Sequence, residues 1–236
     1  MIERFSDDFE EKVSEKYESV EKIPVVQEAI LFIESKLPKK YPELAGKFKE
    51  VLPYHGISHA KEVIRQAIYF ALADGSFSER ELELLGIAAA FHDAGYAVQY
   101  DRNEVFGADM AEDSMKKSGQ YGESEIEVVK KAVLSTMVEF EPVFKQLIQE
   151  ERIGRILADA DTSNFGRENF FDRNKRVFQE LEALGKIKDT DEGKLKFKEF
   201  VVHMLHTHKW NTEIAKNLRE EQKQKNIQIL EEGGFA

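Results

Sequence analysis

Two histidines and two aspartates, carried by three separate segments of the chain, have the residue types expected of a divalent metal site. His59 lies in the first segment, His92 and Asp93 lie together in the second, and the third contributes Asp161. Imidazole and carboxylate ligands suit Mg²⁺, Mn²⁺, Fe²⁺ or Zn²⁺, and four of them leave coordination positions open for water and substrate. Such a metal lowers the pKa of its bound water and stabilises charge on a phosphoryl oxygen. The pattern therefore predicts a divalent metal site that could activate water.

The position of His59 follows from helical spacing. Ser58 is a plausible N-cap, which places His59 in the first turn of the next helix. His59, Val63 and Phe70 recur at the 3.6-residue period on one helix face, so we expect the imidazole to point inward. His55 falls in the loop before this helix, close to the expected site.

The second segment ends a helix whose small residues permit close packing. Ala88, Ala89 and His92 share one face, and Gly95 follows as an expected helix stop. This placement carries His92 and Asp93 into the interior, where an unpaired carboxylate is costly. A cation shared with His92 would satisfy Asp93, and Asp161 follows a third apolar helix face that ends before Gly166.

These segments belong to a chain that we expect to be all-α. Ser78-Glu79-Arg80-Glu81 and Ser124 with Glu127 both match the capping box. No segment shows convincing strand alternation. We predict one domain, with 51–236 as its main helical part, which carries the site, and 1–50 as an N-terminal helical portion. The expected helices lie near 6–20, 24–36, 42–51, 58–73, 79–93, 104–118, 124–138, 142–157, 167–184, 193–207 and 210–231.

Composition excludes several classes of ligand. The chain has 236 residues, no cysteine and a net charge of −11, so any metal must bind nitrogen and oxygen. It has no basic stripe, so we expect no nucleic acid polymer as a partner. Its longest apolar stretch is far short of the roughly 20 residues of a membrane span. The acidic start is unlike a signal peptide, and we expect a cytoplasmic protein without membrane association.

The chain resembles the HD superfamily of metal-dependent phosphohydrolases, and most closely the branch that contains the cyclic-nucleotide phosphodiesterases. The resemblance spans about half of the chain, from Tyr54 to Gly166, and implies a multi-helix HD-domain bundle. Gly56 and Glu62 depart from the Asn and Asp of that branch, and no histidine follows Asp93 closely. The motifs that carry the resemblance are Tyr54-His55 with His59-Ala60 and Val63, Ala88–Asp93, and Ala160–Asn164.

The resemblance also implies roles for individual residues. His59, His92, Asp93 and Asp161 are expected to be the metal ligands, and His55 is expected to protonate the leaving oxygen. Asp93 counts among the catalytic residues, because it can bridge to a second metal ion. We therefore expect one or two divalent metals and a small phosphorylated substrate, with a nucleotide phosphodiester favoured. The alternatives are a phosphomonoesterase such as a nucleotidase, a metal-bound nucleotide sensor without turnover, and an interaction protein whose histidines and aspartates are merely packed.

Several other polar residues leave two interpretations open. Asp159 can support a metal-bound histidine or water, or it can cap the turn at Gly166. Asn103 and Glu104 can touch a second metal, although an acidic first helical turn is the favoured interpretation.

The remaining clusters are expected to be structural. His203, His206 and His208 have no carboxylate at matching helical spacing, so packing or a wet surface is favoured. The run from Glu220 to Lys225 is expected to be a solvated helix face. Four phenylalanines can clamp an aromatic base but are expected in the core, namely Phe165, Phe170, Phe171 and Phe178.

Overall fold

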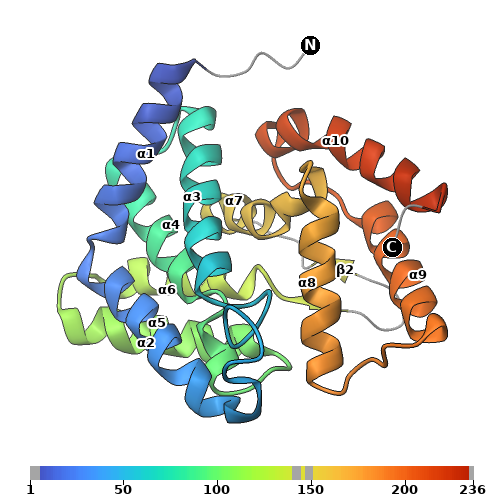
Figure 1. The fold of residues 1–236 in the computed structure, drawn as a ribbon. Helices are drawn as coiled ribbons and strands as arrows, with labels where there is room; N and C mark the ends of the chain where they lie inside the picture. Colours follow the sequence, from blue (N-terminus) through green and yellow to red (C-terminus); the bar gives the residue numbers. More distant parts are fainter. Residues whose placement is uncertain (1–5, 140–144, 147–150, 234–236) are drawn as a thin grey trace.

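The fold is all-α apart from one short pair of strands, and the computed structural model describes residues 6–139, 145–146 and 151–233. Ten α-helices lie within these residues (Figure 1). They are α1 (Asp7–Glu21), α2 (Pro24–Lys40), α3 (Ile57–Asp74), α4 (Glu79–Phe91), α5 (Asn103–Ser118), α6 (Glu123–Leu134), α7 (Arg152–Asp161), α8 (Phe170–Ala183), α9 (Asp191–Thr207) and α10 (Glu213–Glu231). The shorter elements are η1 (Pro42–Leu44), η2 (Ala94–Ala97), η3 (Thr162–Gly166), and strands β1 (Val138–Glu139) and β2 (Lys145–Gln146).

The larger hydrophobic core joins α1 to α7. Helix α3 packs against both α4 and α7, while α4 also packs against α2 and α6. Ile64, Leu85 and Ile156 are among the side chains that this packing removes from solvent. Val26 and Ile33 of α2 belong to the same core. The prediction that 1–50 and 51–236 form one domain stays a prediction, although the N-terminal helices share this core.

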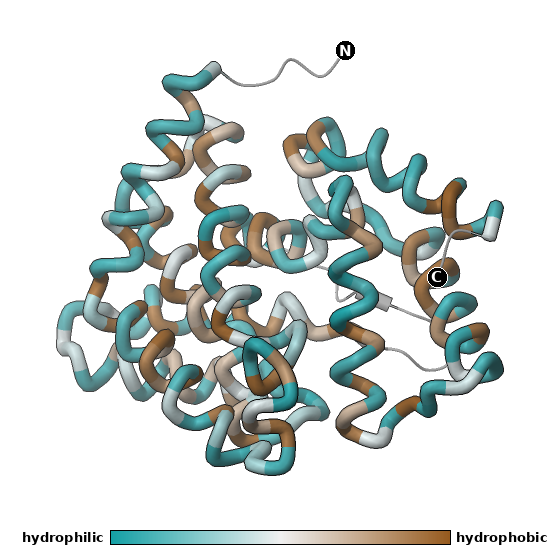
Figure 2. The backbone as a smooth tube through the Cα atoms, in the orientation of Figure 1, coloured by the Kyte–Doolittle hydropathy of each residue, from teal (hydrophilic) through white to brown (hydrophobic). Residues whose placement is uncertain are grey.

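A second, smaller hydrophobic cluster joins η3 to α8, α9 and α10. It contains Phe165, Phe170 and Leu205, with Phe171 and Phe178 packed against it. The four phenylalanines therefore lie in or against a core, as expected. Figure 2 shows hydrophobic residues gathered where helices face one another and hydrophilic residues on their outer sides. Within the described residues, no helix is long and apolar enough to cross a membrane.

Two predicted helices are wrong where the structure describes them. Only η1 forms within 42–51, since Ala45 already leaves helical geometry with a ψ of 123° and Gly46 follows with a φ of +81°. The helix predicted over 142–157 begins only at Arg152, and Lys145–Gln146 instead pairs antiparallel with Val138–Glu139. Helix α6 accordingly ends at Leu134, before the predicted 138. Helical periodicity does not reveal such pairing, because its hydrogen bonds run between two neighbouring strands and not along one segment. Residues 142–144 and 147–150 lie outside the described part.

The capping signals have mixed outcomes. The capping box of Ser78 and Glu81 is confirmed at the start of α4. The box predicted at Ser124 is wrong, because the N–H of Gly122 donates to the Glu125 carboxylate and α6 starts at Glu123. Ser58 is not an N-cap either, since Gly56 occupies that position. His59 nevertheless lies in the first turn of α3.

Candidate metal centre

Packing of α3 against α4 and α7 brings the four predicted ligands together. His59 projects from the first turn of α3 and is almost fully buried. His92 and Asp93 directly follow the last turn of α4, and His92 has no exposed surface. Asp161 is the last residue of α7. Three segments separated by tens of residues thus meet at one point inside the bundle.

The side-chain atoms of these residues lie within a few ångströms of one another. The Nε2 atom of His59 is 3.4 Å from Asp93 Oδ2 and 3.2 Å from Asp161 Oδ1. The Nε2 atom of His92 is 3.2 Å from Asp93 Oδ2 and 3.6 Å from Asp161 Oδ1. Potential ligand atoms of His59, His92 and Asp93 all fall within 4.8 Å of one another. The arrangement is compact enough to enclose a single cation.

The hydrogen bonds of His92 show that two acceptor atoms of this cluster lack a donor. Its Nδ1 lies 2.7 Å from the carbonyl oxygen of Ala89, which can only accept, so Nδ1 carries a hydrogen. The Nε2 atom of a neutral ring then presents a lone pair, and it is buried without a hydrogen bond. Asp93 Oδ2 is also buried without one. Two buried acceptor atoms that lie close together, with no hydrogen-bond donor between them, are suited to binding a divalent cation.

Protonation states in the absence of a cation support the same conclusion. Burial by itself lowers the pKa of His92, but Asp93 and Asp161 outweigh it and raise that pKa well above its ordinary value. The histidines in turn hold the pKa of the Asp161 carboxyl far below its usual range, against the opposing effect of burial. A proton on His92 thus takes the place of a cation. Metal binding would release this proton, so metal affinity should fall as the pH falls.

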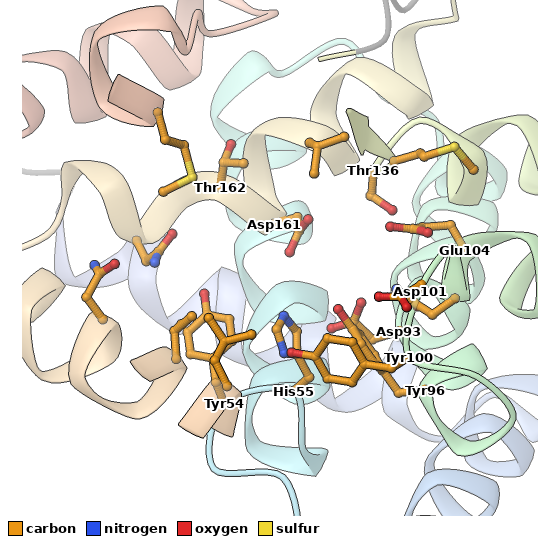
Figure 3. A pocket seen from close by; sticks show the side chains of 18 of the residues that line it. Tyr54, His55, Asp93, Tyr96, Tyr100, Asp101, Glu104, Thr136, Asp161 and Thr162 are labelled. Atoms are coloured by element: carbon orange, nitrogen blue, oxygen red, sulfur yellow. The ribbon is translucent and has the colours of Figure 1, made fainter. Parts of the chain in front are cut away.

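The cluster opens into a cavity of about 800 Å³. Asp93 and Asp161 line one end together with His55 and Glu104, and Figure 3 shows their side chains surrounding a common space. Apolar side chains of α8 and α9 line another part, namely Val177, Leu181, Phe197, Val201 and Met204. The cavity therefore combines a charged end with an apolar wall and is large enough for a small organic phosphate.

Glu180 of α8 is a site residue that the sequence did not indicate. Its carboxylate is fully buried and lies 2.5 Å from Nδ1 of His55. It also accepts hydrogen bonds from the backbone N–H groups of Tyr54 and His55, and from the hydroxyl of Tyr100. The ring of Tyr96 stacks on His55 at a centroid distance of 4.5 Å. No local pattern marks Glu180, because its partner is 125 residues away in the sequence.

This contact sets both the orientation and the charge of His55. Burial lowers the pKa of His55, but the Glu180 carboxylate, with smaller contributions from Asp93 and Asp161, raises it to about 9. His55 is therefore protonated at neutral pH. Since Glu180 holds Nδ1, the proton on Nε2 is the one left for transfer in the cavity. His55 thus has the charge state of a general acid.

The start of α5 lies beside the same cavity. The helix begins at Asn103 with Glu104 in its first turn, which agrees with the favoured interpretation. Burial raises the pKa of Glu104, and the negative charges of Asp93 and Asp161 add to the effect. Gly95 is not a helix stop as predicted, because η2 continues through it. A Cβ there would come within 1.8 Å of the Asn103 carbonyl oxygen, so this close approach requires glycine.

Asp159 fits neither of its two interpretations. Its fully buried carboxylate accepts four hydrogen bonds, from the backbone N–H and side chain of Asn211 and of Thr212. These bonds hold the segment before α10, whose N-cap is Thr212. Asp159 therefore joins α7 to α10 and neither supports a metal-bound group nor caps the turn at Gly166.

The C-terminal polar clusters are only partly as predicted. His203 and His206 are exposed, and His206 pairs with Glu231 at 2.8 Å. His208 is buried, and its Nε2 lies 3.1 Å from Thr162 Oγ1. The solvated face predicted for the run from Glu220 to Lys225 is wrong at Lys223. That side chain is buried and donates to the carbonyl oxygen of His208.

Part of the chain matches a known protein family. No curated protein and no solved structure matches the chain. The family model described as HD domain matches residues 56–163. His59, His92, Asp93 and Asp161 all fall within the match, and His55 immediately precedes it. The cyclic-nucleotide phosphodiesterase branch stays a prediction. Residues 56–163 thus carry an HD domain, which supports assigning the chain to the HD superfamily of metal-dependent phosphohydrolases.

Proposed function

We propose that the protein hydrolyses a small phosphate ester, in the first instance a nucleotide phosphodiester, with one or two divalent metal ions. The observation that carries the proposal is the buried pair of acceptors, His92 Nε2 and Asp93 Oδ2, with the protonated His55 at the same cavity. His59 and Asp161 complete the proposed ligand set. When bound, the metal would neutralise charge on the phosphoryl oxygens and activate water.

The remaining chemistry falls to residues of the chain. The Ala89 carbonyl orients His92 through its Nδ1 hydrogen, so that Nε2 faces the carboxylates. Glu180 orients His55 and keeps it protonated. His55 then donates its Nε2 proton to the oxygen of the departing alcohol, which would otherwise leave as an unstable alkoxide. The half-buried ring of Tyr54 and the buried ring of Tyr96 contact His55 and limit its access to water.

The test separates two histidines that are four residues apart. We expect His59→Ala to lose most of its divalent metal by elemental analysis, because His59 is a proposed ligand. We expect His55→Asn to keep its metal, since the amide can still donate to Glu180. Its turnover of an unactivated ester should fall by about 10²–10⁴, the usual effect of losing a general acid. The loss should be much smaller for a nitrophenyl ester, whose leaving group needs no proton.

The substrate class is tested by turnover with Mg²⁺, Mn²⁺, Fe²⁺ or Zn²⁺ against cyclic nucleotides, nucleoside mono- and triphosphates and simple diesters. Hydrolysis of monoesters alone would replace the phosphodiester assignment by a phosphomonoesterase. Loss of metal in His55→Asn would make His55 a ligand and remove the general acid. Stoichiometric nucleotide binding without turnover would favour a sensor, and a wild-type protein that binds no metal would refute the proposal.

A further inference from the structure

Arg102 has an unusual backbone conformation at the edge of the cavity. It lies between η2 and α5, at the N-cap of α5, with φ of 58° and ψ of 38°. Among the described residues it is the only one other than glycine with a positive φ. The left-handed region is unfavourable for a long side chain, and glycine adopts it without steric cost. An arginine at this position therefore suggests a use for its side chain.

The charges that line the cavity indicate what this use is. The acidic side chains are Asp93, Asp101, Glu104 and Asp161. The basic ones are Arg102, Lys186 and His55, of which His55 is paired with Glu180. Lys186 is already neutralised, because its Nζ lies 2.7 Å from Asp101 Oδ1 and 4.7 Å from the centre of the Tyr100 ring. The guanidinium of Arg102, by contrast, makes no ion pair or hydrogen bond with any described residue. It is the cavity cation that remains available to an anion.

The segment that carries Arg102 is also held in place on both sides. Gly95 lets the Asn103 carbonyl approach η2 more closely than any side chain would allow. The side-chain amide of Gln99 donates to the carbonyl oxygen of Asp101 at 2.6 Å. Asn103 itself is almost fully buried at the start of α5. The turn is therefore determined by its neighbours, and the position from which Arg102 projects is well defined.

We propose that Arg102 binds the phosphoryl oxygens of the substrate and so determines specificity for phosphorylated ligands. This rests on the proposed function for the identity of the reaction. A guanidinium can donate two parallel hydrogen bonds to a phosphate, which a lysine ammonium cannot do with the same geometry. It also offsets the carboxylates that would otherwise repel an anionic ester. The strained turn is the means by which the chain places this cation at an acidic cavity.

The test uses inorganic phosphate as a probe, titrated calorimetrically into wild type and variants at fixed divalent metal. Arg102→Ala should weaken phosphate binding by about tenfold or more, the usual effect of removing a hydrogen bond to a charged group. Arg102→Lys should recover only part of the loss. Arg176→Ala, which removes an exposed arginine of α8 that does not line the cavity, should leave phosphate binding unchanged.

Arg102→Gly separates the backbone from the side chain. We expect it to bind phosphate as weakly as Arg102→Ala, yet to unfold at a temperature equal to or above that of wild type, because glycine relieves the left-handed conformation. An unfolding temperature well below wild type would overturn the claim that the side chain is retained at the expense of stability.

The binding measurements decide the inference independently of turnover. Equal phosphate affinity in Arg102→Ala and wild type, or no phosphate binding by wild type at all, would overturn it. Loss of turnover in every protein with the affinity contrast intact would refute only the proposed hydrolysis. Where turnover is measurable, Arg102→Ala should raise KM for the ester by more than it lowers kcat, since the contact forms before the reaction.

Discussion

His55 and Glu180 form a pair in which the pKa of the histidine is raised and the pKa of the carboxyl is lowered. Glu180 is fully buried, yet four hydrogen bonds and the positive charge of His55 keep its pKa below the ordinary value although burial acts in the opposite direction. The same contact raises the pKa of His55 to about 9. A histidine at this position without such a partner would lose its proton to burial. Glu180 is therefore the positioning residue on which the proposed general acid depends.

A pH profile tests this dependence. A general acid must be protonated, so kcat should fall as the pH rises through the pKa of His55. Bound metal offsets the charges of Asp93 and Asp161, which places the alkaline limb at or below about pH 9. Glu180→Gln removes the largest contribution that raises this pKa while burial still lowers it. We expect the alkaline limb to move to lower pH by one unit or more, measured as kcat against pH.

The matched control is Glu182→Gln, which neutralises an exposed carboxylate one position beyond Leu181 on the same helix. Its profile should coincide with that of wild type. An unchanged alkaline limb in Glu180→Gln would mean that another group provides the acid. The metal content should be equal in all three proteins, because Glu180 contacts none of the proposed ligands.

At the level of the elements, the metal centre depends on how closely α5 approaches the end of α4. Gly107 lies at this contact, where a Cβ would come within 2.3 Å of the Phe91 carbonyl oxygen and 3.4 Å of that of His92. His92 and Asp93 follow immediately. Any separation of the two helices therefore shifts the segment that carries half of the proposed ligands.

We expect Gly107→Ala to lower the free energy of unfolding by about 1–3 kcal/mol, because the added methyl group overpacks a backbone contact that cannot yield cheaply. It should also weaken metal binding, measured by calorimetry beside urea unfolding. Gly122→Ala is the control, since its φ is −77° and the nearest atom to its Cβ is 3.9 Å away. Comparable losses in both variants would show that the close approach of α5 is not responsible.

Across the whole molecule, negative charge is in excess and part of it is concentrated in the interior. The chain carries 45 acidic and 34 basic residues. Asp93 and Asp161 lie against the buried His59 and His92, and Glu104 lines the same cavity as these two carboxylates. Carboxylates held close together in a low-dielectric interior repel one another. A divalent cation that binds only the folded state removes this repulsion and stabilises the fold through linkage.

We therefore predict that a divalent metal at 100 times its dissociation constant adds about 2.7 kcal/mol to the free energy of unfolding. For a chain of this size the unfolding temperature should rise by roughly 5–10 °C, measured by calorimetry with and without a chelator. His59→Ala should lose most of this increase. His203→Ala, which alters an exposed histidine of α9, should keep it in full. An equal increase in both variants would place the metal elsewhere.

The sequence by itself determined the helical class and the residues that gather at the centre. Both depend on short-range physics: periodicity of 3.6 residues places His59 on the inward face of α3, and the small residues of α4 carry His92 and Asp93 inside. The capping box at Ser78 is equally local, because donor and acceptor are three residues apart. Patterns of this kind survive in any tertiary context that buries the apolar face.

Only the tertiary structure decided which distant groups meet. Glu180 reaches His55 across 125 residues, and Asp159 binds a segment 52 residues further along. The strand pair displaced a predicted helix over a much shorter range, because its hydrogen bonds join two neighbouring segments instead of successive turns of one helix. The positive φ of Arg102 depends on a turn that neighbouring residues hold in place on both sides. The acidic and basic side chains that line the cavity come together only in the folded protein. Contacts and charges of this range belong to the packing of helices, which no single segment encodes.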